Sequence, residues 1–249
     1  MIKFGTSVPP FLVLTILTLI LSTGPAASQD LSIPDLGGDA LTGRSLQLIA
    51  LLTVLSLAPG IAIMVTCFPF LVTVLSILRQ AIGLQQSPPN MLIVSLALFL
   101  TYFIMDPVFR TAWNDGLQPL LQDTIGFEEG FERTLMPFRV FMAGRLDPET
   151  FTSMAELRPD ASGLQPGPEA PLSILIPSFL LSEIARAFQI GFLIFLPFLI
   201  IDLVVAAVLM SMGMMMVPPA IVSLPFKLAF FVIADGWHLL ASALVRGYS

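Results

Sequence analysis

Several charged and polar side chains lie inside otherwise apolar sequence, and these are the residues that could do chemistry. Glu183, Arg186 and Gln189 in SEIARAFQ recur at every third position, so they share one side of a helix. Asp202 lies in LIIDLVV and Lys227 in LPFKLAFF. A charge at the centre of a bilayer costs about 3 kcal/mol on insertion scales, so such residues usually pair or line a pathway. We favour the structural pairs Glu183–Arg186 and Asp202–Lys227, within a chain or between subunits, over a proton or ion relay.

Methionines gather in residues 209–219, which read LMSMGMMMVPP. Five of the chain's twelve methionines lie there: Met210, Met212, Met214, Met215 and Met216. Gly213 and the pair Pro218 and Pro219 stop regular helix, so the sequence predicts a loop or a helix break. Thioether side chains fill irregular gaps, and a ring of them from several subunits would block water and ions as an apolar constriction. Ordinary core filling and a site for a soft metal ion are the alternatives.

Catalytic and cofactor-binding motifs are missing from the sequence. The chain has one histidine, His238, and contains neither a His-x-x-Glu-His pair nor a phosphate-binding Gly-x-x-x-x-Gly-Lys-Ser/Thr loop. No serine or threonine has a recognisable base nearby in sequence. The single cysteine, Cys67, excludes an intrachain disulfide and a thiolate metal cluster. The sequence therefore predicts a protein that is not an enzyme and that needs no cofactor and no metal.

The composition places these residues in a membrane protein. Hydrophobic residues make up 56% of the 249 positions and charged residues 11%, with a mean hydropathy of +0.91. Soluble domains carry roughly 25% charged residues. The chain also has 17 acidic and 11 basic residues, whereas a nucleic-acid-binding protein needs a basic face.

The first 28 residues are typical of a cleavable secretory signal. Lys3 supplies a positive start, residues 11–21 (FLVLTILTLIL) form a short apolar stretch, and small residues follow at Ala26 and Ser28. The stretch is shorter than the roughly 20 residues that span a bilayer, although a retained short anchor is an alternative. Residues 29–44 would then form an exported polar arm.

The remaining chain predicts an all-α, multi-span membrane protein of kinked helical hairpins. We expect a first apolar hairpin over 45–105, an acidic and mostly helical extracytoplasmic segment over 106–171, and a C-terminal apolar core over 172–249. Arg79 is the only charge between Arg44 and Asp106, so its turn should face the cytoplasm and 106–171 the periplasm. Prolines interrupt the apolar segments, and broken helix is tolerated in a membrane only where protein or a wet cavity covers it. We therefore expect helices packed against other subunits.

Two long blocks of sequence carry a family resemblance. Residues 177–237, which begin PSFLLSEIARAFQIGF, and residues 78–108, LRQAIGLQQSPPNMLIVSLALFLTYFIMDPV, closely resemble the FliP family. That family is the P component of the bacterial flagellar export gate, with counterparts in virulence type III secretion. Phe70 stands where the family usually has arginine, so any ion pair of that arginine is absent, and Leu84 stands where threonine is usual.

The resemblance implies a non-enzymatic subunit of the bacterial inner membrane, at the flagellar basal body. Family members assemble as several copies with FliQ-like and FliR-like membrane subunits into a channel for unfolded export substrates. Their methionine-rich loop is thought to seal that channel, and it matches residues 214–216, with Met210 and Met212 in the same motif. Glu183, Asp202 and Lys227 match family positions that would join subunits.

A stand-alone ion or solute transporter is the competing interpretation. Glu183, Arg186 and Asp202 would then form the transport site. The sequence shows no inverted repeat of the kind common in transporters, and few acids lie in its apolar segments. An intramembrane hydrolase is disfavoured because no nucleophile and base are arranged together.

Overall fold

A computed structural model describes residues 48–49, 52–53, 56–57, 60–84, 88–161, 163–214 and 216–248 of the chain. The chain divides into two compact units, residues 1–53 and 54–249, and the second unit is described by itself below. The expected signal segment over 1–28 and polar arm over 29–44 lie outside the described residues, as does Met215.

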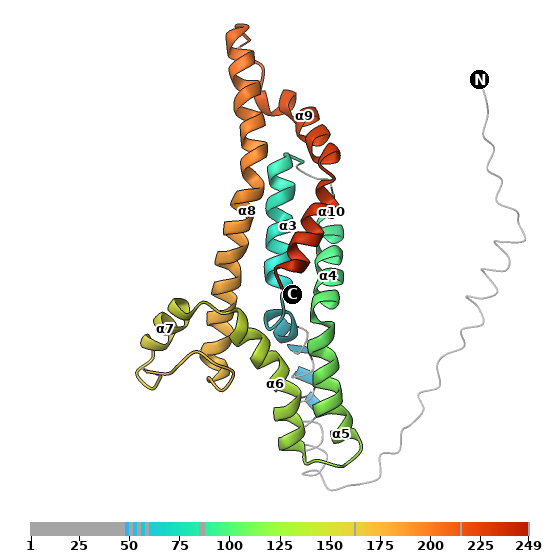
Figure 1. The fold of residues 1–249 in the computed structure, drawn as a ribbon, viewed down its shortest axis with the longest axis vertical. Helices are drawn as coiled ribbons and strands as arrows, with labels where there is room; N and C mark the ends of the chain where they lie inside the picture. Colours follow the sequence, from blue (N-terminus) through green and yellow to red (C-terminus); the bar gives the residue numbers. More distant parts are fainter. Residues whose placement is uncertain are drawn as a thin grey trace, which may run out of the picture. The chain divides into compact units, whose positions relative to one another are not determined.

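The described part of the second unit is helical throughout (Figure 1). Its named elements are α3 (Phe68–Ile82), α4 (Asn90–Ala112), the π-helical turn η1 (Trp113–Leu117), α5 (Gln118–Leu121), α6 (Phe127–Arg145), α7 (Pro148–Glu156), α8 (Leu172–Ser211), α9 (Pro219–Ile233) and α10 (Gly236–Arg246). The expected all-α fold class is confirmed for these residues.

The helix α3 is the centre of the packing. It lies along α8 over a longer contact than any other pair of described helices, and α4 packs beside it. Leu71 and Val74 of α3, Ala97 and Met105 of α4 and Ala187 of α8 are all buried in one apolar cluster. At Gly191 of α8, an added Cβ would overlap the Ile77 side chain, so glycine permits this close approach of two helices. The three helices therefore form one packed layer.

The acidic segment is folded rather than a loose loop. Glu128 and Glu129 lie in the first turn of α6 and Arg145 in its last turn, which complements the helix dipole. The carboxylate of Asp147 caps α7 by accepting from the Thr150 N–H and hydroxyl at 2.9 and 2.8 Å, and these hydrogen bonds lower the pKa of Asp147. A second apolar cluster then packs α6 and α7 against the start of α8. The boundary expected at Asp106 falls inside α4, which continues to Ala112.

The third apolar segment forms one helix, not the hairpin that its length allowed. The helix α8 is uninterrupted for 40 residues, although Pro177 and Pro197 lie inside it. Its length is therefore about 60 Å at 1.5 Å per residue, roughly twice a hydrocarbon core of about 30 Å. Figure 1 shows its last turns projecting beyond the end of α3.

Two stretches of the described residues are long and apolar enough to cross a membrane. They are Asn90–Leu121 and Leu172–Ser211, and a third candidate exists if α9 and α10, bent by 61° at their junction, count as one span. Only 11% of the most apolar window of Leu172–Ser211 is buried within the chain. The outer face of α8 therefore meets lipid or other polypeptide.

Candidate functional site

The methionine-rich loop is fixed by a glycine that ends α8. Gly213 has φ of +74°, in the left-handed region that favours glycine. The Met214 N–H donates to the Leu209 carbonyl and the Gly213 N–H to the Met210 carbonyl, each at 3.0 Å. This pair of hydrogen bonds is the Schellman motif that closes a helix. Pro218 then precedes α9 and Pro219 opens it, where proline's missing N–H costs nothing.

The methionine side chains contact little of their own chain. Met216 is 98% exposed, Met212 65% and Met210 61%, whereas Met214 is 39% exposed. Leu209, by contrast, is buried beneath them. The end of α8 that carries this loop is the end far from α7 (Figure 1). An apolar loop left so open needs a further surface to cover it.

A buried ion pair holds the two helices that flank this loop. Lys227 of α9 lies 2.6 Å from Asp202 of α8, and its side chain is 7% exposed. The Lys227 Nζ also donates to the Ala81 carbonyl in the last turn of α3 at 3.1 Å, where the helix dipole favours a cation. Ser223 donates to the Asp202 carboxylate at 2.5 Å. This joint therefore ties α3, α8 and α9 together and fixes the base of the methionine loop.

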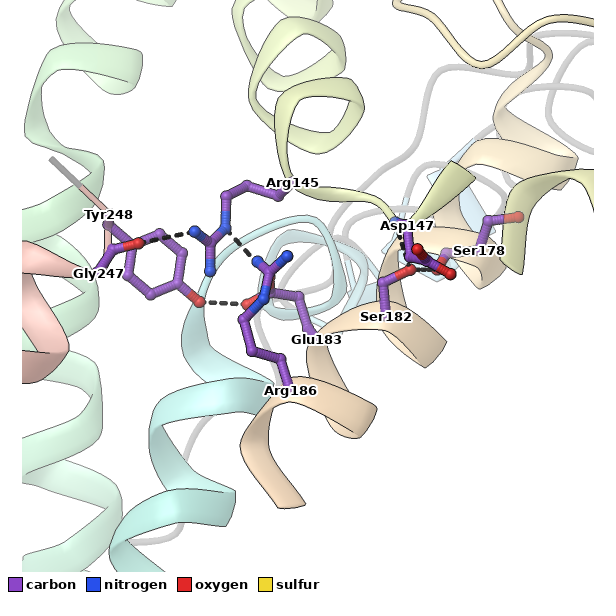
Figure 2. Close-up of polar contacts among 8 residues, drawn as sticks. All are labelled: Arg145, Asp147, Ser178, Ser182, Glu183, Arg186, Gly247 and Tyr248. Atoms are coloured by element: carbon purple, nitrogen blue, oxygen red, sulfur yellow. Dashed lines mark hydrogen bonds and ion pairs between the residues drawn. The ribbon is translucent and has the colours of Figure 1, made fainter. Parts of the chain in front are cut away.

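A second charged cluster surrounds Glu183, which is fully buried (Figure 2). Its carboxylate accepts from the Nε of Arg145 and the Nη1 of Arg186, both at 3.2 Å, and from the Tyr248 hydroxyl. Arg145 donates further to the Gly247 carbonyl at 2.7 Å, and its guanidinium lies 4.0 Å above the Tyr248 ring. The cluster therefore joins α6, α8 and the end of the chain.

The chemistry of this cluster is that of a structural joint. Burial, followed by the charge of Glu183, raises the pKa of Tyr248, so its hydroxyl stays protonated and donates. Two arginines and one hydroxyl donate to the carboxylate, so this buried charge is compensated within the chain. The single histidine, His238, is 79% exposed and lies 3.8 Å from Asp235 on α10. Among the described residues, no group of three or more His, Cys, Asp or Glu side chains could hold a metal ion.

The expected pairs are thus both present within one chain. Glu183 meets Arg186 and Asp202 meets Lys227, while Gln189 lies exposed on α8 and takes part in neither cluster. The structure places Met210 in the last turn of α8 and Met212, Gly213, Met214 and Met216 between α8 and α9. They follow Glu183 by more than 25 positions, so the two sites lie toward opposite ends of α8.

Comparison with known proteins decides the family. The model of the FliP family matches residues 51–244. The chain belongs to the FliP family. Its relatives named flagellar biosynthetic protein FliP include that of Caulobacter vibrioides, 51% identical over 85% of this chain and 79% of the relative. The one from Aquifex aeolicus is 46% identical over 92% and 97%. The one from Bacillus subtilis is 44% identical over 82% and 92%.

In this FliP-family chain, the sequence did not predict several of the residues that surround Glu183 and the Asp202–Lys227 pair. Arg145 and Tyr248 are 38 and 65 positions from Glu183, so no local spacing links them. Ser223 is 21 positions from Asp202, so local spacing does not link these two residues either. Phe70, where the family usually has arginine, is buried and packs edge-to-face on the Tyr248 ring at 5.5 Å between centroids. An aromatic pair thus occupies the space beside Glu183.

Proposed function

We propose that this chain is a subunit of the bacterial flagellar type III protein export gate. In this proposal, several copies assemble with FliQ-like and FliR-like membrane subunits in the cell membrane at the flagellar basal body. Together they form a channel for unfolded export substrates. Membership of the FliP family and the printed name of its relatives, flagellar biosynthetic protein, support this function.

The observation that carries the proposal is the exposed methionine loop at the end of α8. The loop is anchored on both sides, because the Gly213 turn closes α8 and the Asp202–Lys227 pair joins α8 to α9. Met212 and Met216 are largely exposed, and methionine is an unbranched side chain with several rotatable bonds. Copies arranged around an axis would bring their methionines together into an apolar constriction. Unbranched thioethers would close it against ions and still yield to a passing polypeptide.

The arrangement of the helices supports the proposed orientation. Arg79 lies in the last turn of α3, the end to which Lys227 is bonded through Ala81. The helices α6 and α7, which belong to the acidic segment, pack at the opposite end of α8 (Figure 1). A membrane with the Arg79 end in the cytoplasm therefore leaves the acidic segment in the periplasm, as the positive-inside rule favours.

The seal is tested by replacing Met214, Met215 and Met216 with alanine in the assembled complex. The shortened side chains should leave the constriction open, so cells should lose membrane potential while the complex still co-purifies. A potential-sensitive dye measures the leak. The matched control replaces Met64, Met91 and Met136, which are also exposed but lie outside the loop, with alanine. An unchanged potential in the loop variant would count against the seal.

A stand-alone transporter makes a different prediction for the purified protein. Its transport site would use Glu183, Arg186 and Asp202, but these side chains are engaged with partners in the folded chain. Native mass spectrometry of the gently extracted protein separates the two functions. A multi-copy complex with two other small membrane proteins supports the gate, and a lone monomer or simple homodimer supports the transporter.

A further inference from the structure

A cavity of about 400 Å³ lies between the α3–α4 pair and the α9–α10 pair. Its lining is almost wholly apolar and includes Leu75, Leu78, Ile93, Leu96, Phe231 and Trp237. Its volume is in the range of about 300–1,000 Å³ that is typical of small-molecule sites. Neither the joint at Lys227 nor the cluster at Glu183 uses this space.

One cation borders the cavity. Arg79 is half-buried in its wall, near the end of α3. Its guanidinium donates to the side-chain oxygen of Asn90, but it pairs with no carboxylate in the part of the chain that the structure describes. Asp202, which lines a neighbouring cavity with Arg79, is committed to Lys227. The wall of the cavity therefore carries a positive charge that no carboxylate of the described residues neutralises.

The residues and helices around the cavity indicate which kind of molecule it could bind. A cavity lined by apolar side chains disfavours water, which needs two to four polar partners. The helices that line it include α4 and the α9–α10 pair, which are candidate membrane spans. In a bilayer the neighbouring medium is hydrocarbon chains, each attached to a polar headgroup. An acyl chain suits the apolar walls, and a phosphate suits the planar, five-donor guanidinium of Arg79.

We propose that this cavity binds one acyl chain of an anionic phospholipid, with the lipid phosphate on Arg79. Basic pockets between membrane helices on the cytoplasmic side are known to hold anionic headgroups. The site does not depend on a role in export, because it uses only the cavity, its lining and the charge of Arg79.

The experiment uses the full complex, isolated in mild detergent and exchanged into nanodiscs of equal phosphatidylglycerol and phosphatidylethanolamine. Native mass spectrometry then measures which lipid stays bound to each chain after release from the disc. Arg79→Gln removes the charge with little change in size. Leu96→Phe fills the cavity and keeps the charge. Arg110→Gln is the matched control, because Arg110 is an exposed arginine at the other end of α4.

The wild type and Arg110→Gln should retain phosphatidylglycerol over phosphatidylethanolamine by at least about fivefold, which corresponds to one charge-assisted contact. Arg79→Gln should bring that ratio close to one, and Leu96→Phe should reduce the retention of both lipids. Equal ratios in Arg79→Gln and Arg110→Gln would overturn the site. A wild type that retains no lipid would also overturn it and would indicate that a neighbouring polypeptide fills the cavity.

Discussion

At its N-terminal end, α8 is covered by its own chain. Leu175 and Phe179 are fully buried against α6 and α7, and Glu183 is satisfied by three donors. At its C-terminal end, Leu203, Val204 and Val208 are more than half exposed, and so are Met210, Met212 and Met216. Both ends are apolar in sequence, so hydropathy does not distinguish them. The first end completes the fold of one chain, and the second presents apolar side chains that its own chain does not cover.

This difference indicates where each kind of substitution should act. Changes at the covered end should lower the stability of the chain itself. Changes at the bare end should leave the chain folded and weaken its assembly or its seal. The charged joint at Asp202 lies between the two, since it anchors α9 within the chain and also positions the loop.

The largest loss of stability is expected when Glu183 is replaced. Glu183→Ala leaves Arg145, Arg186 and Tyr248 without their shared acceptor, and breaking a buried pair in this way costs about 3–5 kcal/mol. Thermal unfolding of the detergent-solubilised protein should show a large fall in Tm. Glu183→Gln keeps an acceptor oxygen and is expected to be intermediate. A Tm of Glu183→Ala equal to that of the wild type would mean that the cluster does not hold the covered end together.

A smaller loss of stability is expected at the Asp202–Lys227 pair, because Asp202 is less buried than Glu183. Asp202→Lys places a second cation beside Lys227 and should cost about 2–3 kcal/mol, since a buried charged donor loses its partner. The double variant Asp202→Lys with Lys227→Asp restores opposite charges across the same gap. We expect it to recover complex on native gels that either single reversal loses. The absence of any recovery would contradict a direct pairing, although the Ala81 hydrogen bond of Lys227 makes the recovery partial.

Much of this arrangement could be predicted from the sequence because its signals are local. Gly213 and the two prolines mark the end of α8 and the start of α9, and Glu183 and Arg186 are one helical turn apart. The prolines of residues 172–217 allowed either kinked helices or hairpins, and the structure has one helix over Leu172–Ser211 because proline alone does not turn a chain. Pro177 and Pro197 have no Gly or Asn turn signal beside them, and a membrane helix tolerates proline where neighbouring groups satisfy the freed carbonyl.

The contacts that the sequence could not predict are those made across the fold. Arg145 lies in the acidic segment and looked like one surface charge among many, yet it reaches Glu183 and the Gly247 carbonyl. Tyr248 stands at the end of the chain and gives no pattern of its own. The Ala81 carbonyl that binds Lys227 is 146 positions away and belongs to the backbone. Only the packing of α3, α6 and α9 on α8, with α10 against α4 and α9, brings these groups together.

Replacement of Leu203 is expected to change the stability of the chain least. Together with the same replacement at Leu175, it tests directly whether the two ends of α8 differ. Leu203 and Leu175 are the same residue type on the same helix, 61% and 0% exposed. Leu175→Ala should lower the free energy of unfolding by about 2–5 kcal/mol, since it leaves a cavity among packed side chains. Leu203→Ala should change it by less than about 0.5 kcal/mol. Denaturant titration of both detergent-solubilised variants measures the difference.

The yield of assembled complex should respond to Leu203→Ala, although the stability of the single chain does not. A leucine that is bare in one chain but covered by a neighbouring subunit loses its contacts only in the complex, so Leu203→Ala should reduce the yield of co-purified complex while its unfolding curve stays that of the wild type. If Leu203→Ala leaves the complex intact as well, that face of α8 meets lipid rather than protein, because lipid tails fill around a shortened side chain at little cost. The surface available for subunit contacts would then narrow to the methionine loop itself.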